Sequence, residues 1–267
     1  MNRRTSLAPA VYVAFLLVPV YWLLIMSLKT SGEIGGSFMP YPQAPTLENF
    51  TFILGDPAWY FGYLNALIYV LINVALSVTV AIPAAFAFSR YRFFGDRVLF
   101  FGFLAFRMMA PAILLVPFVQ IFSDLNLIDT HIAVAIAHCF FNVPIAVWIL
   151  EGFISSIPRD IDDSARIDGY GLIRYFRKIL LPLIAPGIAV TAFFCFMFSW
   201  VEALLANGLT VVEAKPINGI LTRVSSVMAA DVPLLAAAGV LGLIPGVIFI
   251  VFMRNHLARG FSMGRVV

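Results

Sequence analysis

The residues best suited to an interaction or a reaction are gathered in one stretch of this chain, from Phe153 to Gly187, between two long apolar runs. Its charged residues are Arg159, Asp160, Asp162, Asp163, Arg166, Asp168, Arg174, Arg177 and Lys178. Apolar residues recur among them near a helical period, and Gly169 stands where one short helix would turn into the next. The pattern predicts an amphipathic helix–turn–helix that docks a soluble partner through charged and apolar contacts.

Catalysis by the chain itself is not indicated. The sequence has no phosphate-binding G-x-x-x-x-G-K-[ST] loop, no H-E-x-x-H pair and no G-x-S-x-G nucleophile turn. Its histidines, His131, His138 and His256, are scattered and predict no metal site. We therefore expect no enzyme, no metal and no cofactor, and any energy source must lie on another chain.

Composition predicts a membrane protein. The chain is 62% hydrophobic and 12% charged, with a mean hydropathy of +0.98, whereas soluble domains carry about 25% charged residues. The 26 phenylalanines exceed what one water-soluble core would hold. The cysteines, Cys139 and Cys195, lie in apolar runs and are interpreted as core residues rather than a disulfide. We expect lipid contacts and no nucleic-acid partner.

Apolar runs long enough to cross a bilayer predict an all-α polytopic membrane protein that forms a single transmembrane domain over residues 1–267. The expected spans are 7–28, 60–88, 98–122, 132–153, 182–205 and 233–253, and the charged loop covers about 156–181. The first run follows Arg3 and Arg4 as in a signal peptide, but it is too long and lacks a small-residue cleavage site, so we expect an uncleaved span.

The loops are strongly asymmetric in positive charge. One side carries only Lys29, Lys215 and Arg223. The other carries Arg3, Arg4, Arg90, Arg92, Arg97, Arg159, Arg166, Arg174, Arg177, Lys178, Arg254, Arg259 and Arg265. The positive-inside rule then places both termini and the charged loop in the cytoplasm, where ATP is available.

The charged loop also resembles a known family motif. Asp163-Ser164-Ala165, Gly169 and Leu181-Pro182 match the E-A-A…G…L-P cytoplasmic loop of the membrane subunits of bacterial ABC importers. Ile157-Pro158 and the core around Asp168 fit the carbohydrate branch, the maltose-type second permease family. The resemblance extends over nearly the whole chain through Ser27-Leu28-Lys29-Thr30, Phe88-Ser89-Arg90-Tyr91-Arg92-Phe93, Met108-Met109-Ala110-Pro111, Arg259-Gly260 and Gly264.

Two departures from the family pattern are visible. Asp163-Ser164 replaces Glu-Ala, which keeps an acid and a small residue, so the docking role is unaffected. Asn65-Ala66 stands where many relatives have Asn-Ser, and the sequence suggests no consequence.

The resemblance implies a multi-pass subunit of a bacterial inner-membrane complex. Its partners would be a second homologous permease, two ATP-binding cassette subunits and an extracytoplasmic solute-binding protein. Transport would proceed by alternating access as the ATP-binding subunits close and reopen. By this resemblance, the residues coupled to the ATPase are Asp163, Ser164, Ala165, Asp168 and Gly169.

Polar residues inside the spans are candidates for the substrate path. His138 and Asn142 are four residues apart and share one helix face, which fits either a cavity lining or an interhelical hydrogen bond. Arg107 is an intramembrane cation, with a membrane-face or structural ion-pair role as the alternative. Trp200 fits sugar stacking and an interfacial aromatic belt equally well.

The substrate class follows from the resemblance alone. The segments 206–210 and 254–261 resemble polyol and glycerol permeases, and a disaccharide is the alternative substrate. An ion-coupled secondary transporter is the alternative class, although the inverted repeats and broken helices typical of such proteins are not recognisable in the sequence.

Overall fold

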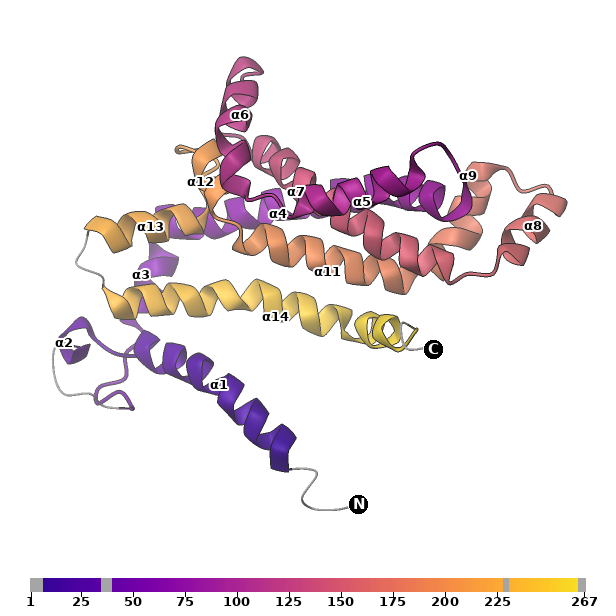
Figure 1. The fold of residues 1–267 in the computed structure, drawn as a ribbon. Coiled ribbons are helices and arrows are strands. Elements are labelled where there is room, and N and C mark those ends of the chain that lie inside the picture. The colour runs from indigo at the N-terminus through magenta and orange to yellow at the C-terminus, as the bar shows by residue number, and fades with distance from the viewer. Residues whose placement is uncertain (1–6, 35–39, 228–230, 264–267) are drawn as a thin grey trace. The chain divides into compact units, whose positions relative to one another are not determined.

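The computed structural model describes residues 7–34, 40–227 and 231–263, and all regular elements in these ranges are helical (Figure 1). In chain order they are α1 (Leu7–Ser27), α2 (Ser31–Ile34), α3 (Glu48–Gly55), α4 (Pro57–Arg90), α5 (Asp96–Arg107), α6 (Pro111–Asp124), α7 (His131–Ser155), α8 (Arg159–Ile167), α9 (Leu172–Tyr175), a π-helix (Phe176–Leu180), α10 (Leu181–Leu183), α11 (Ala185–Val201), α12 (Leu204–Leu209), α13 (Ile217–Val227) and α14 (Val232–Met263). The predicted all-α membrane fold is confirmed. Arg3, Arg4, Gly264 and Arg265, which contribute to the expected orientation and to the family resemblance, lie outside the described residues.

Four described helices, α1, α4, α7 and α14, are long and apolar enough to cross a membrane. Two further candidates are bent pairs: α5 with α6, bent by 95°, and the segment Leu172–Leu183 with α11, bent by 77°. The predicted count of six spans is reached only if each bent pair makes one crossing.

The third predicted span, 98–122, is not one continuous helix. α5 ends at Arg107 and α6 begins at Pro111, with Ala110 extended at φ −69° and ψ 131°. A proline disfavours helical backbone at the residue before it but fits the first turn of a helix, so the chain breaks and restarts here. The break leaves Arg107 in the last turn of α5, where a cation complements the helix dipole.

The chain divides into two compact units, and the first comprises Met1–Leu64 with Pro216–Val247. Within it, the Asn49 side-chain amide of α3 donates to the carbonyls of Ser27 and Lys29, both at 3.0 Å, and so satisfies the C-terminal end of α1. The Tyr63 hydroxyl of α4 donates to the Ala238 carbonyl of α14 at 2.6 Å. Polar side chains thus connect the helices of this unit to one another.

The second unit, Asn65–Lys215 with Ile248–Val267, contains the charged loop. α7 is its most buried helix, with twelve buried residues, and it packs against α5 and α11 (Figure 1). Gly187 of α11 allows this close approach, because a Cβ there would lie 2.5 Å from the Phe153 ring of α7. The prediction of one domain over 1–267 stays a prediction.

Candidate coupling site and polar core

Residues at both ends of α8 favour its boundaries. Pro158 precedes it in an extended conformation, Asp160 and Asp162 lie in its first turn, and Arg166 lies in its last turn. Acids at the N-terminus and a base at the C-terminus both complement the helix dipole. The helix is therefore stabilised by its own charge order as well as by packing.

Gly169 terminates α8 in the left-handed conformation, at φ +76°. The Gly169 N–H donates to the Arg166 carbonyl at 3.0 Å, and the Tyr170 N–H donates to the Ala165 carbonyl at 2.9 Å. This pair of bonds is the Schellman motif, which satisfies the last carbonyls of a helix and reverses the chain. The turn predicted from Gly169 is confirmed, and its geometry directs α9 back toward the spans.

A buried carboxylate on the inner face of α8 forms an ion pair with α4. Asp162 accepts a hydrogen bond from the Tyr175 hydroxyl of α9. It also pairs with the Arg90 guanidinium at the end of α4, with 2.6 Å between Nε and the carboxylate oxygen. One carboxylate therefore connects α8 both to the following helix and to a span.

Further bonds connect the end of α4 to α8, to the segment before α8 and to the end of α7. Arg90 donates to the Ile157 carbonyl at 3.0 Å, and Arg159 donates to the Ser89 carbonyl at 3.3 Å. The Ser89 and Ser155 hydroxyls are 2.7 Å apart, which links α4 directly to α7. A movement of α8 must therefore carry the ends of both helices or break these contacts.

An apolar cluster completes the attachment. Ala165 is 3% exposed and Tyr175 is 6% exposed, and both belong to a cluster whose other buried members are Ala81, Ala85, Phe86, Ala146, Val147, Leu150, Ile154, Leu180, Ile184 and Cys195. The Phe86 ring packs on Phe176 with 4.8 Å between centroids. Helices α4, α7, α8, α9 and α11 thus share one core at this end of the unit.

The outer face of α8 and α9 is open. Asp163, Ser164 and Asp168 are exposed. Ile167 is 86% exposed, and Ile173 is 77% exposed. A carboxylate oxygen of Asp163 lies 3.9 Å from a guanidinium nitrogen of Arg166. Both side chains are well exposed, so this ion pair adds little stability. A surface that combines bare apolar side chains with exposed carboxylates suits docking to another protein.

The structure therefore separates the five predicted coupling residues. Asp163, Ser164 and Asp168 lie on the outer face, Gly169 forms the turn, and Ala165 belongs to the buried core. Ala165 holds the helix against the spans, and the other residues remain accessible to a partner.

His138 and Asn142 lie together in a buried polar core of α4, α7 and α11, and neither has exposed surface. Nε2 of His138 lies 3.0 Å from a carboxylate oxygen of Glu202. The Asn142 amide donates to Asn73 at 2.6 Å and to Ser199 at 3.1 Å. In this conformation both residues make the interhelical bonds that the sequence offered as the alternative, and a substrate role stays a prediction.

Three atoms of this polar core lack a hydrogen-bond partner among the described residues. They are the Tyr69 hydroxyl, Nδ1 of His138 and the side-chain oxygen of Asn142. The Tyr69 and His138 rings are in edge contact, with 5.5 Å between centroids. Buried polar atoms are nearly always paired, so these three retain bonding capacity for a water or a hydroxyl.

The other two path candidates lie on α5 and α11. The Arg107 guanidinium stacks over the Phe198 ring, 4.2 Å from its centroid, so this cation is partnered by an aromatic face. The Trp200 ring stacks on Phe196, 5.9 Å between centroids and 6° from parallel. Both side chains pack on aromatic rings in this conformation, and their roles in the substrate path stay predictions.

The sequence analysis missed two polar side chains, Asn65 and Asp129, that bind the backbone of residues 211–215. Asn65 donates to the Glu213 and Lys215 carbonyls, at 3.0 and 3.1 Å, and its oxygen lies 2.9 Å from His131 Nε2. This gives Asn65 a role that the family resemblance at Asn65-Ala66 did not suggest. The only signal in the sequence was a polar residue within an apolar run.

The second of these residues, Asp129, lies in the connection between α6 and α7 with φ +62°. Its carboxylate accepts the backbone N–H groups of residues 211–214, at 2.9 to 3.1 Å. Partial burial raises the pKa of this carboxyl, but the four backbone donors outweigh that effect and lower it to about 2. Asp129 therefore holds two distant loops together as a permanent anion at neutral pH.

The chain is similar in sequence to membrane subunits of known transporters. Residues 77–263 match the family described as "Binding-protein-dependent transport system inner membrane component". The sulfoquinovosyl glycerol transport system permease SmoH of Agrobacterium fabrum is 29% identical over 93% of this chain and 88% of its own length. The trehalose permease SugB of Mycobacterium tuberculosis is 28% identical over 95% and 93%, and the maltodextrin permease MdxG of Bacillus subtilis 26% over 99% of each.

The fold is shared with solved structures. A chain of a bacterial ABC transporter involved in alginate import matches with a TM-score of 0.78 and 20% identity, over 96% of this chain and 99% of that one. The family match covers well over half of the chain and includes the whole charged loop, residues 156–181. The chain therefore belongs to the family of binding-protein-dependent transport system inner membrane components, as the resemblance of its charged loop predicted.

Proposed function

We propose that this chain is the permease subunit of an ATP-driven, binding-protein-dependent importer of a carbohydrate. The observation that carries the proposal is the two-faced geometry of α8. Its inner face is bonded to α4 and α9 and packs in one apolar cluster with α7, whereas its outer face is exposed. When a partner protein moves such a helix, the membrane-spanning helices attached to its inner face move with it. The matching family and the names of its sugar-transporting members support the same function.

In the proposed mechanism, ATP-binding subunits hold the outer face of α8 and carry it as they close. The ion pair of Arg90 with Asp162 and the apolar cluster around Ala165 pass this movement to α4 and α7. Both helices then move as rigid bodies, and the access to the substrate path changes sides. ATP hydrolysis on the partner reverses the movement, and this chain contributes no catalytic group.

The proposed orientation places α8 and both termini in the cytoplasm of a bacterial inner membrane. The Lys and Arg asymmetry of the loops supports it. The proposed assembly adds a second homologous permease, two ATP-binding subunits and an extracytoplasmic solute-binding protein. The family description, which names binding-protein-dependent transport, supports the last of these partners.

Site-specific photocrosslinking tests the docking surface. A benzoylphenylalanine at position 167 on α8 is expected to crosslink the ATP-binding subunit, because the Ile167 side chain is 86% exposed. The matched control is position 98 on α5, where Val98 is 77% exposed but lies outside the α8 face. Equal crosslinking from both positions, or none from position 167, would contradict docking through α8.

For the substrate we propose a glycoside or oligosaccharide bearing several hydroxyl groups. The named substrates of three relatives, sulfoquinovosyl glycerol, trehalose and maltodextrin, are glycosides, which supports a glycoside over the free polyol expected from the sequence. The unpaired atoms of Tyr69, His138 and Asn142 offer hydrogen bonds to hydroxyl groups once the polar core opens. Both glycerol and a disaccharide therefore belong in the test.

A ligand screen on the cognate solute-binding protein identifies the substrate. Isothermal titration with glycerol, other polyols, disaccharides and glycosyl glycerols is expected to give tight binding for a glycoside and none for glycerol. Uptake of the ligand by cells that carry the complete importer then links binding to transport. Tight binding of glycerol alone would replace the glycoside by the polyol.

A further inference from the structure

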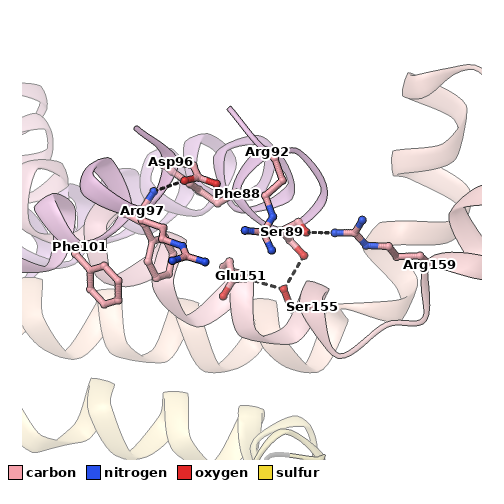
Figure 2. Close-up of a pocket in the computed structure, with 10 residues that line it drawn as sticks. Phe88, Ser89, Arg92, Asp96, Arg97, Phe101, Glu151, Ser155 and Arg159 are labelled. Atoms are coloured by element: carbon pink, nitrogen blue, oxygen red, sulfur yellow. Dashed lines mark hydrogen bonds between the residues drawn. The ribbon is translucent and has the colours of Figure 1, made fainter. Parts of the chain in front are cut away.

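A basic hollow lies beside the α8 attachment, and the coupling mechanism makes no use of it. It encloses about 310 Å³ and is lined by residues of α4, the α4–α5 connection, α5, α7 and α8. Figure 2 shows that Arg92, Arg97 and Arg159 reach it from three different segments, with their guanidinium groups directed toward Ser89 and Glu151. Three segments of the chain thus bring three cations to one place.

Some charged groups of this hollow have hydrogen-bond partners and others have none among the described residues. Asp96 accepts the backbone N–H of Arg97 at 2.6 Å, and Glu151 accepts the Ser155 hydroxyl at 2.6 Å. Arg159 donates to the Ser89 carbonyl. Among the described residues, the guanidinium groups of Arg92 and Arg97 have neither a hydrogen bond nor an ion pair.

Three arginines against two carboxylates leave one net positive charge in the hollow. The planar fork of a guanidinium matches a phosphate, which accepts two parallel hydrogen bonds. A ligand with a single phosphodiester charge therefore complements the hollow both in charge and in donor geometry.

The surroundings of the hollow are apolar. Phe88, Phe100 and Phe101 contribute to its lining. Phe94 is fully exposed in the connection before α5, and Val98 and Phe101 are 77% and 65% exposed along α5. A continuous exposed apolar surface at the end of a span fits contact with lipid. The ligand that suits this site is an anion with a long apolar part.

We propose that the hollow binds the headgroup of an anionic phospholipid, with the phosphate between Arg92 and Arg97 and the acyl chains along α5. Basic pockets between membrane helices on the cytoplasmic side are suited to anionic headgroups. The site rests on the proposed orientation, which places it at the inner leaflet. Because Arg159 and Ser89 belong both to this hollow and to the α8 attachment, bound lipid stabilises the coupling helix.

Native mass spectrometry tests the site on the assembled importer. The purified complex is incubated with equal amounts of phosphatidylglycerol and phosphatidylcholine of identical acyl chains, and the retained lipids are counted. The wild type is expected to retain phosphatidylglycerol preferentially. The double variant Arg92→Gln/Arg97→Gln is expected to lose this preference by roughly 5-fold for each arginine removed.

Two controls distinguish a lipid site from a general effect of positive charge and from a site for free phosphate. Arg254→Gln removes an exposed arginine of α14 outside the hollow and should keep the preference. Inorganic phosphate at millimolar concentration should not displace the lipid, because it lacks the acyl chains. Displacement by phosphate would assign the hollow to a free anion and overturn the proposal.

The remaining outcomes are equally decisive. An unchanged lipid preference in the double variant, or equal retention of both lipids by the wild type, would overturn the lipid site. A loss of the second permease or of the ATP-binding subunits from the double variant, with the lipids unchanged, would make the hollow a protein interface. Failure of the lipid site leaves the proposed function intact, because subunit co-purification and uptake are read separately in the same samples.

Discussion

Replacing Gly169 by valine tests how the end of α8 controls coupling. Gly169 has φ +76°, and a Cβ built there meets no atom within 4 Å. The substitution therefore causes no clash inside the chain, and its cost comes from the backbone alone. A side chain in the left-handed region costs about 1–2 kcal/mol, and a β-branched residue is a pronounced outlier there.

That cost reduces the population of the native turn relative to a displaced α9 by roughly 5- to 30-fold. Because Tyr175 of α9 donates to Asp162 of α8, a displaced α9 also loosens the attachment to Arg90. We expect Gly169→Val to insert in the membrane, to retain less ATP-binding subunit on purification and to transport poorly.

A graded series makes this prediction specific to backbone conformation. Asparagine tolerates positive φ better than other residues with a Cβ. We expect uptake and ATPase co-purification to fall in the order glycine, asparagine, alanine, valine at position 169. Equal loss with asparagine and valine would mean that the partner requires the absence of a side chain. Full activity of Gly169→Val would refute the role of the turn.

Three further predictions concern the polar contacts. In a double-mutant cycle, Arg90→Gln and Asp162→Asn should lower ATPase co-purification non-additively, with a coupling of about 0.5–3 kcal/mol, and additive losses would contradict a direct pair. Tyr69→Phe removes a hydroxyl without a partner among the described residues, so complex assembly and thermal stability should be unchanged while uptake falls, and normal uptake would remove Tyr69 from the substrate path. Asp129→Asn should lower the unfolding temperature of the purified complex at pH 7. Because folding lowers the pKa of this carboxyl from 3.8 to about 2, its stabilisation is present above the higher value and is lost as the pH falls toward the lower one, where the two proteins should unfold alike.

The helices and the turn within the charged loop were predictable from the sequence because their signals are local. Apolar runs of span length mark α1, α4, α7 and α14, and a glycine after an amphipathic stretch marks the end of α8. The break between α5 and α6 was also within reach, since Pro111 restricts the residue before it. The sequence analysis predicted one span over 98–122 because it used only the length of the apolar run.

The polar contacts were not predictable, because their partners are far apart in the chain. Asp162 pairs with Arg90 across 72 positions and Asp129 binds backbone more than 80 positions away. Periodicity places a residue on a helix face but does not say which helix lies opposite. The same limit left Ala165 grouped with the docking residues, although its helix face is the buried one.

The energy source of transport tests the central claim most directly. The assembled importer is reconstituted in proteoliposomes with its solute-binding protein, and uptake of the labelled substrate is measured with ATP on the side of α8 or with a sodium or proton gradient. We predict uptake only with hydrolysable ATP. We also predict that uptake is lost when α8 carries Asp163→Lys, which reverses the charge of an exposed residue on the proposed docking face. Uptake driven by an ion gradient without ATP would instead identify a secondary transporter.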